Sequence, residues 1–586
     1  NCVNSIAPMV QNINHQMAGI PRPVYKGQAD SYTAACYRAL DVVDRAIFGT
    51  AEAADVTSGV TISGSSYVNT TQNVLSGGTT EDCTYSSGCV ENVYSGATAS
   101  ANSIVLGGKQ YVYAGGTAID TNTAGGWFYG NTTLYRGVQV VLEGGVSENT
   151  HIGRLGYQIV ASGGLSKNTD FTTVSGGVQL IDPGGKAVGT TLTKGNTMHV
   201  NGVATDTVVS GAAVQTVSSG GSAKNTILNG EGAEQDVASG GRVQDTTING
   251  GTQNVLSGGV SMLATLNGGT QNLEAGAVVS FDTVNANGVE NVNNGVSVYG
   301  TTVNSGGIEN INEGGLAELS ALNNGGIQNV NKGGSARYTA VNSGGVANVN
   351  SGGVAEYTVV DDGGVQNVNE GGTAQSGQID KSGVQKVNEG GLAVSTTLCS
   401  GSLQEVYAGA LVSNTTLAAG AVQNIYDGGT GINNIIDGVE NLSSGALADC
   451  NTIYTGGTQN INAGAIAKNT TVNADGVQNI NSGATAKGVH INLGGVQNVN
   501  DGGVANINFI NDGAIQNVKS GGSAENNTVS SGGSQNIEEG GYAYGNIISL
   551  GGMQTVGQGG VASHNELNGG AQNIASGGTA DYTTVN

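Results

Sequence analysis

The stretch "GGVQNVNEGG" (Gly363–Gly372) decides how this chain folds, because near copies of it recur along most of the sequence. With the Gln of each copy taken as position 0, its Gln-Asn-aliphatic triplet or a close variant starts at 27 places, and most steps between them are 19 residues. Eight successive steps of 19 run from residue 271 to residue 423. Such a fixed short period indicates a repeat architecture rather than one large globular core.

The third residue of the triplet is its most constant feature. Position 2 is Val, Ile or Leu in all 27 copies, whereas position 0 is Gln in 21 copies and Glu in four. We therefore expect position 2 to point into a core. A fully extended triplet would point Gln inward as well and Asn outward, whereas a bend at the triplet would reverse these directions. The sequence leaves both arrangements open.

The paired glycines exclude a helical unit and suit tight turns. Each unit then consists of two short strands joined by Gly turns, and stacked units share one continuous core. The sequence predicts an all-β fold, a right-handed parallel β-helix (β-solenoid) of about 27 coils with a 19-residue period. At about 4.8 Å per coil, such a stack is a rod on the order of 130 Å long.

Two segments depart from the repeat. Residues 1–57 contain no Gly-Gly pair, and "SYTAACYRALDVVDRAIFG" (31–49) has helical spacing, so we expect a small, partly helical N-terminal cap before a solenoid at 58–586. The step from 110 to 139 is 29 residues long, which places an inserted loop near 121–130. Since the repeat pattern continues to Asn586 with no visible cap, we expect the natural polypeptide to extend further.

The inserted loop holds the only tryptophan of the chain, Trp127, beside Phe128 and Tyr129. Loops on solenoids carry function more often than coils do, so this cluster is a candidate contact for a glycan or a protein. A loop folded back over a coil edge explains the three aromatic residues equally well.

The six cysteines and the acidic composition favour an extracellular setting. The spacing allows disulfides between Cys2 and Cys36 and between Cys83 and Cys89. Cys399 and Cys450 lie three coils apart, about 14 Å along the axis, so we expect these two not to pair with each other.

Composition and spacing argue against several classes of function. The net charge of -24 opposes nucleic-acid binding, and no run of about 18 apolar residues forms a spanning helix. No C-x-x-C pair supports a zinc site, and the turns lack the aspartates of calcium-binding β-rolls. Because the acidic residues do not gather with Arg or His in adjacent coils, we predict no catalytic residues, no metal, no cofactor and no enzymatic activity.

The unit "GGVQNVNEGG" followed by "VNSGG" resembles the passenger repeat of AIDA-type self-associating autotransporter adhesins over roughly residues 60–586. The resemblance implies a bacterial passenger, secreted or anchored in the outer membrane through a β-barrel outside this chain, that acts in cell-cell aggregation, biofilm formation or host adhesion. It also implies O-glycosylation in the turns. The matching serines are Ser76, Ser219, Ser239, Ser257, Ser351, Ser482, Ser520 and Ser576.

Three functions follow as hypotheses. The first is an adhesin at the bacterial cell surface that self-associates with identical chains and also contacts host surface glycans or proteins. The second is an extracellular filament or sheath protein that polymerises head to tail through its N-terminal cap. The third is a polysaccharide-processing β-helix.

Overall fold

The computed structural model describes residues 51–52, 54–127, 134–171 and 175–586, and these residues form an all-β parallel solenoid of about 27 turns. No helix occurs among them, and therefore no helix in these ranges has the length and apolarity to cross a membrane. The chain forms two compact units, one of 1–224 with 236–242 and one of 225–235 with 243–586. The predicted helical segment 31–49 lies outside the described residues.

One coil of the second unit shows how the repeat folds. The opening stretch forms β50 (Val365–Val368), and β51 (Thr373–Gln375) and β52 (Gln378–Ile379) complete the coil. β50 pairs in parallel, without offset, with the equivalent strands β47 (Val346–Val349) and β53 (Val384–Val387) of the coils on either side. Strands in equivalent places therefore form three parallel sheets, where the sequence predicted two strands per unit.

The third strand arises from a corner that carries no glycine signal. Ser376, at position 10, has φ of 53° and turns the chain between β51 and β52. This left-handed conformation recurs at position 10 of the other coils, but Asn, Asp, Ser, Gly and several larger residues occupy it. Because the residue type varies, the sequence alone did not reveal the corner.

The alternation of β50 decides which way the triplet points. Gln366 and Val368 are buried, whereas Val365 and Asn367 are only partly buried. The triplet is therefore extended, with Gln inward and Asn outward. Ala374 from β51 and Ile379 from β52 complete the apolar part of the core in this coil.

The two glycines of a pair have different roles. Gly371 has φ of 69°, and its N–H donates to the carbonyl oxygen of Gly390 in the next coil (3.0 Å). Gly372 is needed for space, because a Cβ there would overlap the carbonyl oxygen of Val349 in the preceding coil. The pair therefore fixes both the turn and the close approach of neighbouring coils.

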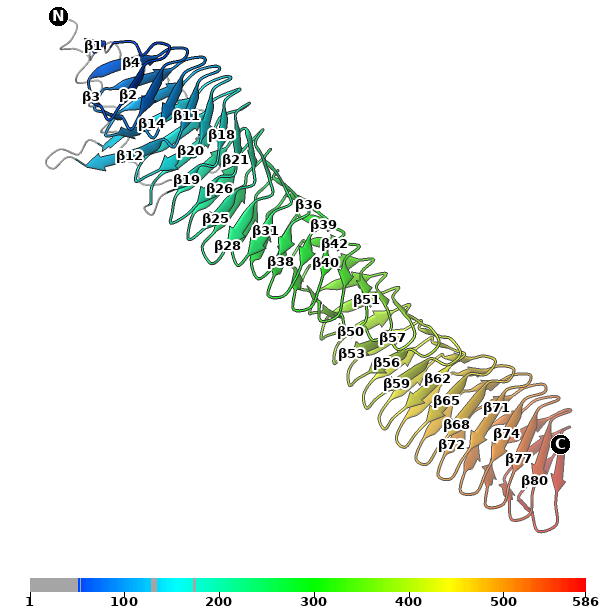
Figure 1. Ribbon diagram of the computed structural model, residues 1–586. Coiled ribbons are helices and arrows are strands. Elements are labelled where there is room, and N and C mark those ends of the chain that lie inside the picture. The colour runs from blue at the N-terminus through cyan, green and yellow to red at the C-terminus, as the bar shows by residue number, and fades with distance from the viewer. Residues whose placement is uncertain (1–50, 53, 128–133, 172–174) are drawn as a thin grey trace, which may run out of the picture. The chain divides into compact units, whose positions relative to one another are not determined.

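The first unit has the same three-strand coil with one departure. A typical coil consists of β4 (Thr70–Val74), β5 (Thr79–Glu81) and β6 (Thr84–Ser86). The ten extra residues lengthen β12 (Asn122–Trp127), which pairs antiparallel with β13 (Leu134–Arg136) and leaves the coil (Figure 1). β1 (Ala51–Glu52) already pairs in parallel with β4, so coil structure begins inside the segment predicted as the cap.

In the second unit the first sheet continues strand by strand without interruption (Figure 1). Its strands in the coils discussed below are four residues long: β32 (Thr252–Val255), β35 (Thr270–Leu273), β38 (Val289–Val292), β41 (Ile308–Ile311), β44 (Ile327–Val330) and β47.

We predict that Gly372→Ala lowers the free energy of unfolding by about 1 to 3 kcal/mol, because the new methyl group overpacks two coils. Gly377→Ala is the matched control, since a Cβ there would meet only the Thr358 carbonyl oxygen at 3.4 Å. Chemical denaturation of both variants measures the difference. Equal stability of the two variants would contradict the packing role of the second glycine.

Candidate functional site

The buried Gln side chains form a ladder inside the solenoid. Gln385 Nε2 donates to Gln366 Oε1 (2.8 Å), and Gln404 Nε2 donates to Gln385 Oε1 (2.6 Å). Position 0 is buried in every coil but the last, so each of these amides depends on the adjacent coils for its hydrogen bonds. The Gln of the repeated triplet is therefore scaffold and not a binding site.

Three further ladders of Asn run along the outside of the second unit, at positions 1, 3 and 14. Asn367 Nδ2 donates to Asn348 Oδ1 at position 1, Asn369 Nδ2 to Asn350 Oδ1 at position 3, and both distances are 2.9 Å. The position 14 ladder continues in the same way, with 2.9 Å between Asn342 Nδ2 and Asn323 Oδ1. Much of the hydrogen-bonding capacity of these rows is thus used between coils.

A row of large apolar side chains stands out against these polar faces. It follows the corner between the second and third sheets through six consecutive coils of the second unit, with Tyr299 directly before its corner residue Gly300, and each residue is 43% to 51% exposed. We call it the apolar rim: Leu263, Phe281, Tyr299, Leu319, Tyr338 and Tyr357. Large apolar residues that are exposed side by side mark interaction surfaces more often than single ones do.

The backbone conformation at most residues of the apolar rim is energetically unfavourable. Leu319, Tyr338 and Tyr357 have φ of 59°, 54° and 55°, a conformation that bulky residues rarely adopt and that costs of order 1 kcal/mol or more. Other coils place Asn or Asp at this corner, as at Asn414 and Asn469. In the sequence this departure is visible only when position 10 is compared across the repeats.

Ring contacts tie neighbouring coils of the rim together. The rings of Tyr338 and Tyr357 stack with centroids 5.0 Å apart, and Phe281 meets Tyr299 edge to face at 5.6 Å. Beside the rim, Arg337 Nε donates to Glu356 Oε2 (2.6 Å) in the next coil. The charge of Glu318, on the other side, also favours the protonated guanidinium and contributes to the raised pKa of Arg337. Charges of alternating sign therefore border the apolar row.

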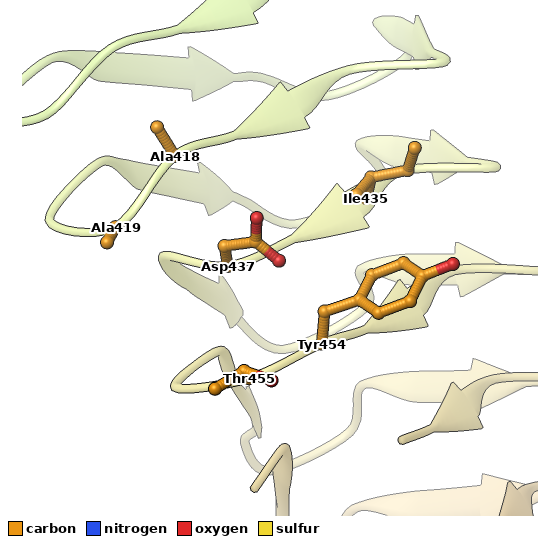
Figure 2. A pocket seen from close by; sticks show the side chains of 6 residues that line it. All are labelled: Ala418, Ala419, Ile435, Asp437, Tyr454 and Thr455. Carbon is orange, nitrogen blue, oxygen red and sulfur yellow. The ribbon is translucent and has the colours of Figure 1, made fainter. Parts of the chain in front are cut away.

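A hollow of about 510 Å³ lies elsewhere in the second unit, where the step from 423 to 440 is only 17 residues (Figure 2). The turn after the third strand of this coil is two residues shorter than in a 19-residue coil, so Asp437 is followed directly by Gly438. Figure 2 shows the lining side chains: Ala418, Ala419, Ile435, Asp437, Tyr454 and Thr455. The hollow is open to solvent and holds one carboxylate, with no second acid or base in its lining.

The predicted aromatic site lies largely outside the described residues. Trp127 is the last residue of β12, where its backbone pairs with Leu134, whereas Phe128 and Tyr129 are not described. A contact for glycans or proteins at this insertion therefore stays a prediction.

The predicted disulfides have different outcomes. Cys2 and Cys36 lie outside the described residues. Cys83 and Cys89 belong to one buried cluster, but the structure has both as free thiols in place of the predicted bond. Cys83 Sγ instead donates to the carbonyl oxygens of Ile62 and Glu81, and burial raises the pKa of both thiols.

The eight serines matched to the turn positions share one environment. Each is exposed, and each precedes a glycine with positive φ in the turn between the first and second strands of its coil. Their hydroxyl groups are therefore accessible along one edge of the coils: Ser76, Ser219, Ser239, Ser257, Ser351, Ser482, Ser520 and Ser576.

No group of three His, Cys, Asp or Glu side chains able to hold a metal ion occurs within the described ranges. The pair of adjacent acids found in the sequence, Asp361 and Asp362, does not form a site together. The pKa of Asp361 is raised by burial and by the charge of Asp380 in the next coil, rather than by Asp362.

Comparison with known proteins agrees with the repeat. The family described as "Adhesin of bacterial autotransporter system, probable stalk" matches residues 351–402. The crystal structure of the TibC-catalyzed hyper-glycosylated TibA55-350 fragment is similar at 33% sequence identity, over 49% of this chain and 100% of that one, with a TM-score of 0.43. No curated protein matches the sequence.

An alginate lyase of family PL6, AlyGC, covers 93% of this chain and 99% of its own at 10% identity, but its TM-score of 0.23 carries no argument. The identity to the TibA fragment over that fragment's whole length, together with the match of the stalk family, decides the assignment. The chain belongs to the AIDA-type autotransporter adhesin passengers, which are extracellular proteins of the bacterial cell surface.

Proposed function

We propose that this passenger mediates cell-cell aggregation and biofilm formation by associating with identical chains on neighbouring cells, and that the apolar rim is the contact. The observation that supports the proposal is the rim itself, six consecutive coils with exposed apolar side chains at a corner where most are left-handed. Neither the exposure of apolar side chains nor this backbone conformation stabilises a single chain, so a favourable contact with another molecule explains the rim best.

Charge supports a second copy of this chain as the partner. The chain has a net charge of -24, so two copies repel each other unless the contact is locally neutral or complementary. The order Glu318, Arg337, Glu356 beside the rim is complementary to itself when a second copy runs antiparallel with the two-fold axis between the coils of Arg337 and Glu356, because the guanidinium of each copy then faces the Glu356 carboxylate of the other. Repetition over six coils makes many weak contacts act together.

Ring geometry favours a protein partner over a sugar at this surface. Sugars bind to open faces of aromatic rings, but Tyr338 and Tyr357 stack on each other with only 11° between their planes. Each ring therefore has one face covered by the other ring, and both residues are about half exposed, which suits packing against side chains. Host adhesion through glycans or proteins is proposed separately for the Trp127, Phe128 and Tyr129 insertion.

We also propose that the passenger is not an enzyme. The adhesin family of the chain supports this proposal, and so does the scatter of its acidic residues over the coils.

Replacing both rim tyrosines in Tyr338→Asn with Tyr357→Asn should weaken self-association of the passenger about tenfold or more, as expected when a central apolar anchor is lost. The thermal unfolding midpoint should stay the same or rise, because Asn adopts the left-handed conformation more readily than Tyr. Sedimentation of the purified passenger and settling of cells that display it measure the two effects.

Tyr407→Asn with Tyr426→Asn is the matched control. These rings also stack, with centroids 5.2 Å apart in the same unit, but they lie at position 3, where Asn is the usual residue. This control should settle like the wild type. If the rim variant also settles like the wild type, self-association does not use the rim.

We further propose that the eight exposed turn serines accept O-linked sugars. The similar TibA fragment is hyper-glycosylated, and the serines of this chain have the accessibility that a transferase requires. Intact-mass measurement of the passenger from its natural host should show additions in equal steps, and changing all eight serines to Ala should remove most of them. A mass equal to that of the bare polypeptide would refute this modification.

A further inference from the structure

Three carboxyl groups are buried together beneath the apolar rim. Glu290 and Glu309 replace Gln at position 0 of consecutive coils, and Asp282 lies at position 11 of the coil before them. Each is at most 1% exposed. We name each coil by the number of its position 0 residue, so that coils 271–328 are the four coils that begin at 271, 290, 309 and 328. The three acids are the only buried ionisable side chains in these four coils, and the described residues include no buried Lys, Arg or His that could neutralise them.

Three acceptor oxygens in this cluster have no hydrogen-bond partner: Gln271 Oε1, Asp282 Oδ2 and Glu290 Oε1. Other coils show what normally fills such places. An Asn at position 11 donates its Nδ2 to the Gln oxygen of its own coil, as Asn434 does to Gln423 Oε1 and Asn508 to Gln497 Oε1, both at 3.2 Å. Asp282 has an oxygen where Asn has that N–H group, and Glu290 has no Nε2 to donate along the ladder, so a proton on Asp282 or on Glu290 is needed to supply a donor to Gln271 Oε1.

A hydrogen-bond donor is also missing between Glu290 and Glu309. In the Gln ladder, the amide of each coil donates to the oxygen of the preceding coil, as Gln328 Nε2 does to Glu309 Oε2 (2.8 Å). Glu309 has no N–H group to donate to Glu290 Oε1, and its two oxygens already accept from Gln328 and Ser320. A protonated carboxyl group supplies the missing donor at this step of the ladder.

The electrostatics agree with this geometry. Burial raises the pKa of Asp282 and of Glu309, each to about 7, and burial together with the charges of Glu309 and Asp282 raises the pKa of Glu290 well above its usual range. Because the folded state binds protons more tightly than the unfolded chain, the stability that these groups contribute is complete below about pH 4 and is lost as pH rises to 7 and above.

A buried Glu alone does not create this need. Glu440 also occupies position 0, but Asn451 Nδ2 donates to both of its oxygens (2.8 and 3.1 Å) and Gln459 Nε2 donates to Oε2 (2.6 Å). Its carboxyl group has no unpartnered oxygen, and its neighbours are amides rather than acids. Glu440 therefore serves as an internal control.

We propose that Asp282, Glu290 and Glu309 form a proton-dependent lock: protonated, they complete the ladder and hold coils 271–328 together, and deprotonated, they loosen these coils and the rim residues Phe281, Tyr299 and Leu319 that the coils carry. Regulation of adhesion by this lock rests on the proposed function of the rim, whereas the lock itself does not. Adhesion through the rim is then strongest at acidic pH and declines as pH rises to 7 and above.

Hydrogen exchange of the full chain at pH 5.5 and pH 8.5 tests the lock directly. After correction for intrinsic rates, exchange in coils 271–328 relative to coils 459–535, whose position 0 residues are all Gln, should rise about tenfold or more at the higher pH. Asp282→Asn with Glu290→Gln and Glu309→Gln installs the residue types of other coils and should abolish the rise, whereas Glu440→Gln should leave it intact.

If the exchange rate in coils 271–328 relative to coils 459–535 does not change with pH in the wild type, the lock is refuted. An equal rise in the triple variant would also refute it. If the triple variant does not fold, Glu290→Gln alone should reduce the rise at least about threefold, and an undiminished rise counts against the lock. Settling of displaying cells at the two pH values separates the two proposals. A normal exchange response with pH-independent settling leaves the lock standing and argues against the rim as the adhesive contact.

Discussion

Most coils bury the side-chain amide of a Gln at position 0 where water does not reach it, and this amide must find its donor and its acceptor on the two neighbouring coils. That constraint fixes the register, because a shift of one residue would point the Gln outward and break every bond of the ladder. It also explains why one residue type recurs at position 0. At coil 347 the position is Ala, and Gln366 Nε2 in the next coil is left without a partner.

The ladder leaves little freedom to most other positions. Positions 2, 8 and 13 supply the apolar core, both glycines of the first pair are held by coil contacts, and the outer Asn rows bond to one another. The corner at position 10 and the serine of the turn remain free to vary without breaking a ladder bond. The turn serines and five of the six rim residues lie at these two places, and Tyr299 directly precedes the corner of its coil.

The sequence predicted much of this fold because stacking repeats the same requirement in every coil. The constancy of position 2 correctly placed residues such as Val368 in the core, and the Gly pairs placed the turns. The third strand was missed because the corner at Ser376 needs a conformation and not a residue type. The rim was missed for the related reason that Tyr338 and Tyr357 are unusual only relative to the other coils. The buried acid cluster depends on contacts between Asp282 and two later coils, which spacing alone does not display.

The central claim is that passengers on neighbouring cells meet at the apolar rim. Photo-crosslinking tests it directly, with a photoreactive residue placed at position 338 in one experiment and at position 395 in another. Ser395 is the corresponding exposed corner of a coil outside the rim in the same unit, with φ of 56°. The account predicts crosslinks between two copies from position 338, joined to peptides of coils 253–365, and few from position 395. Equal yields from both positions, or crosslinks from position 395 alone, would contradict it.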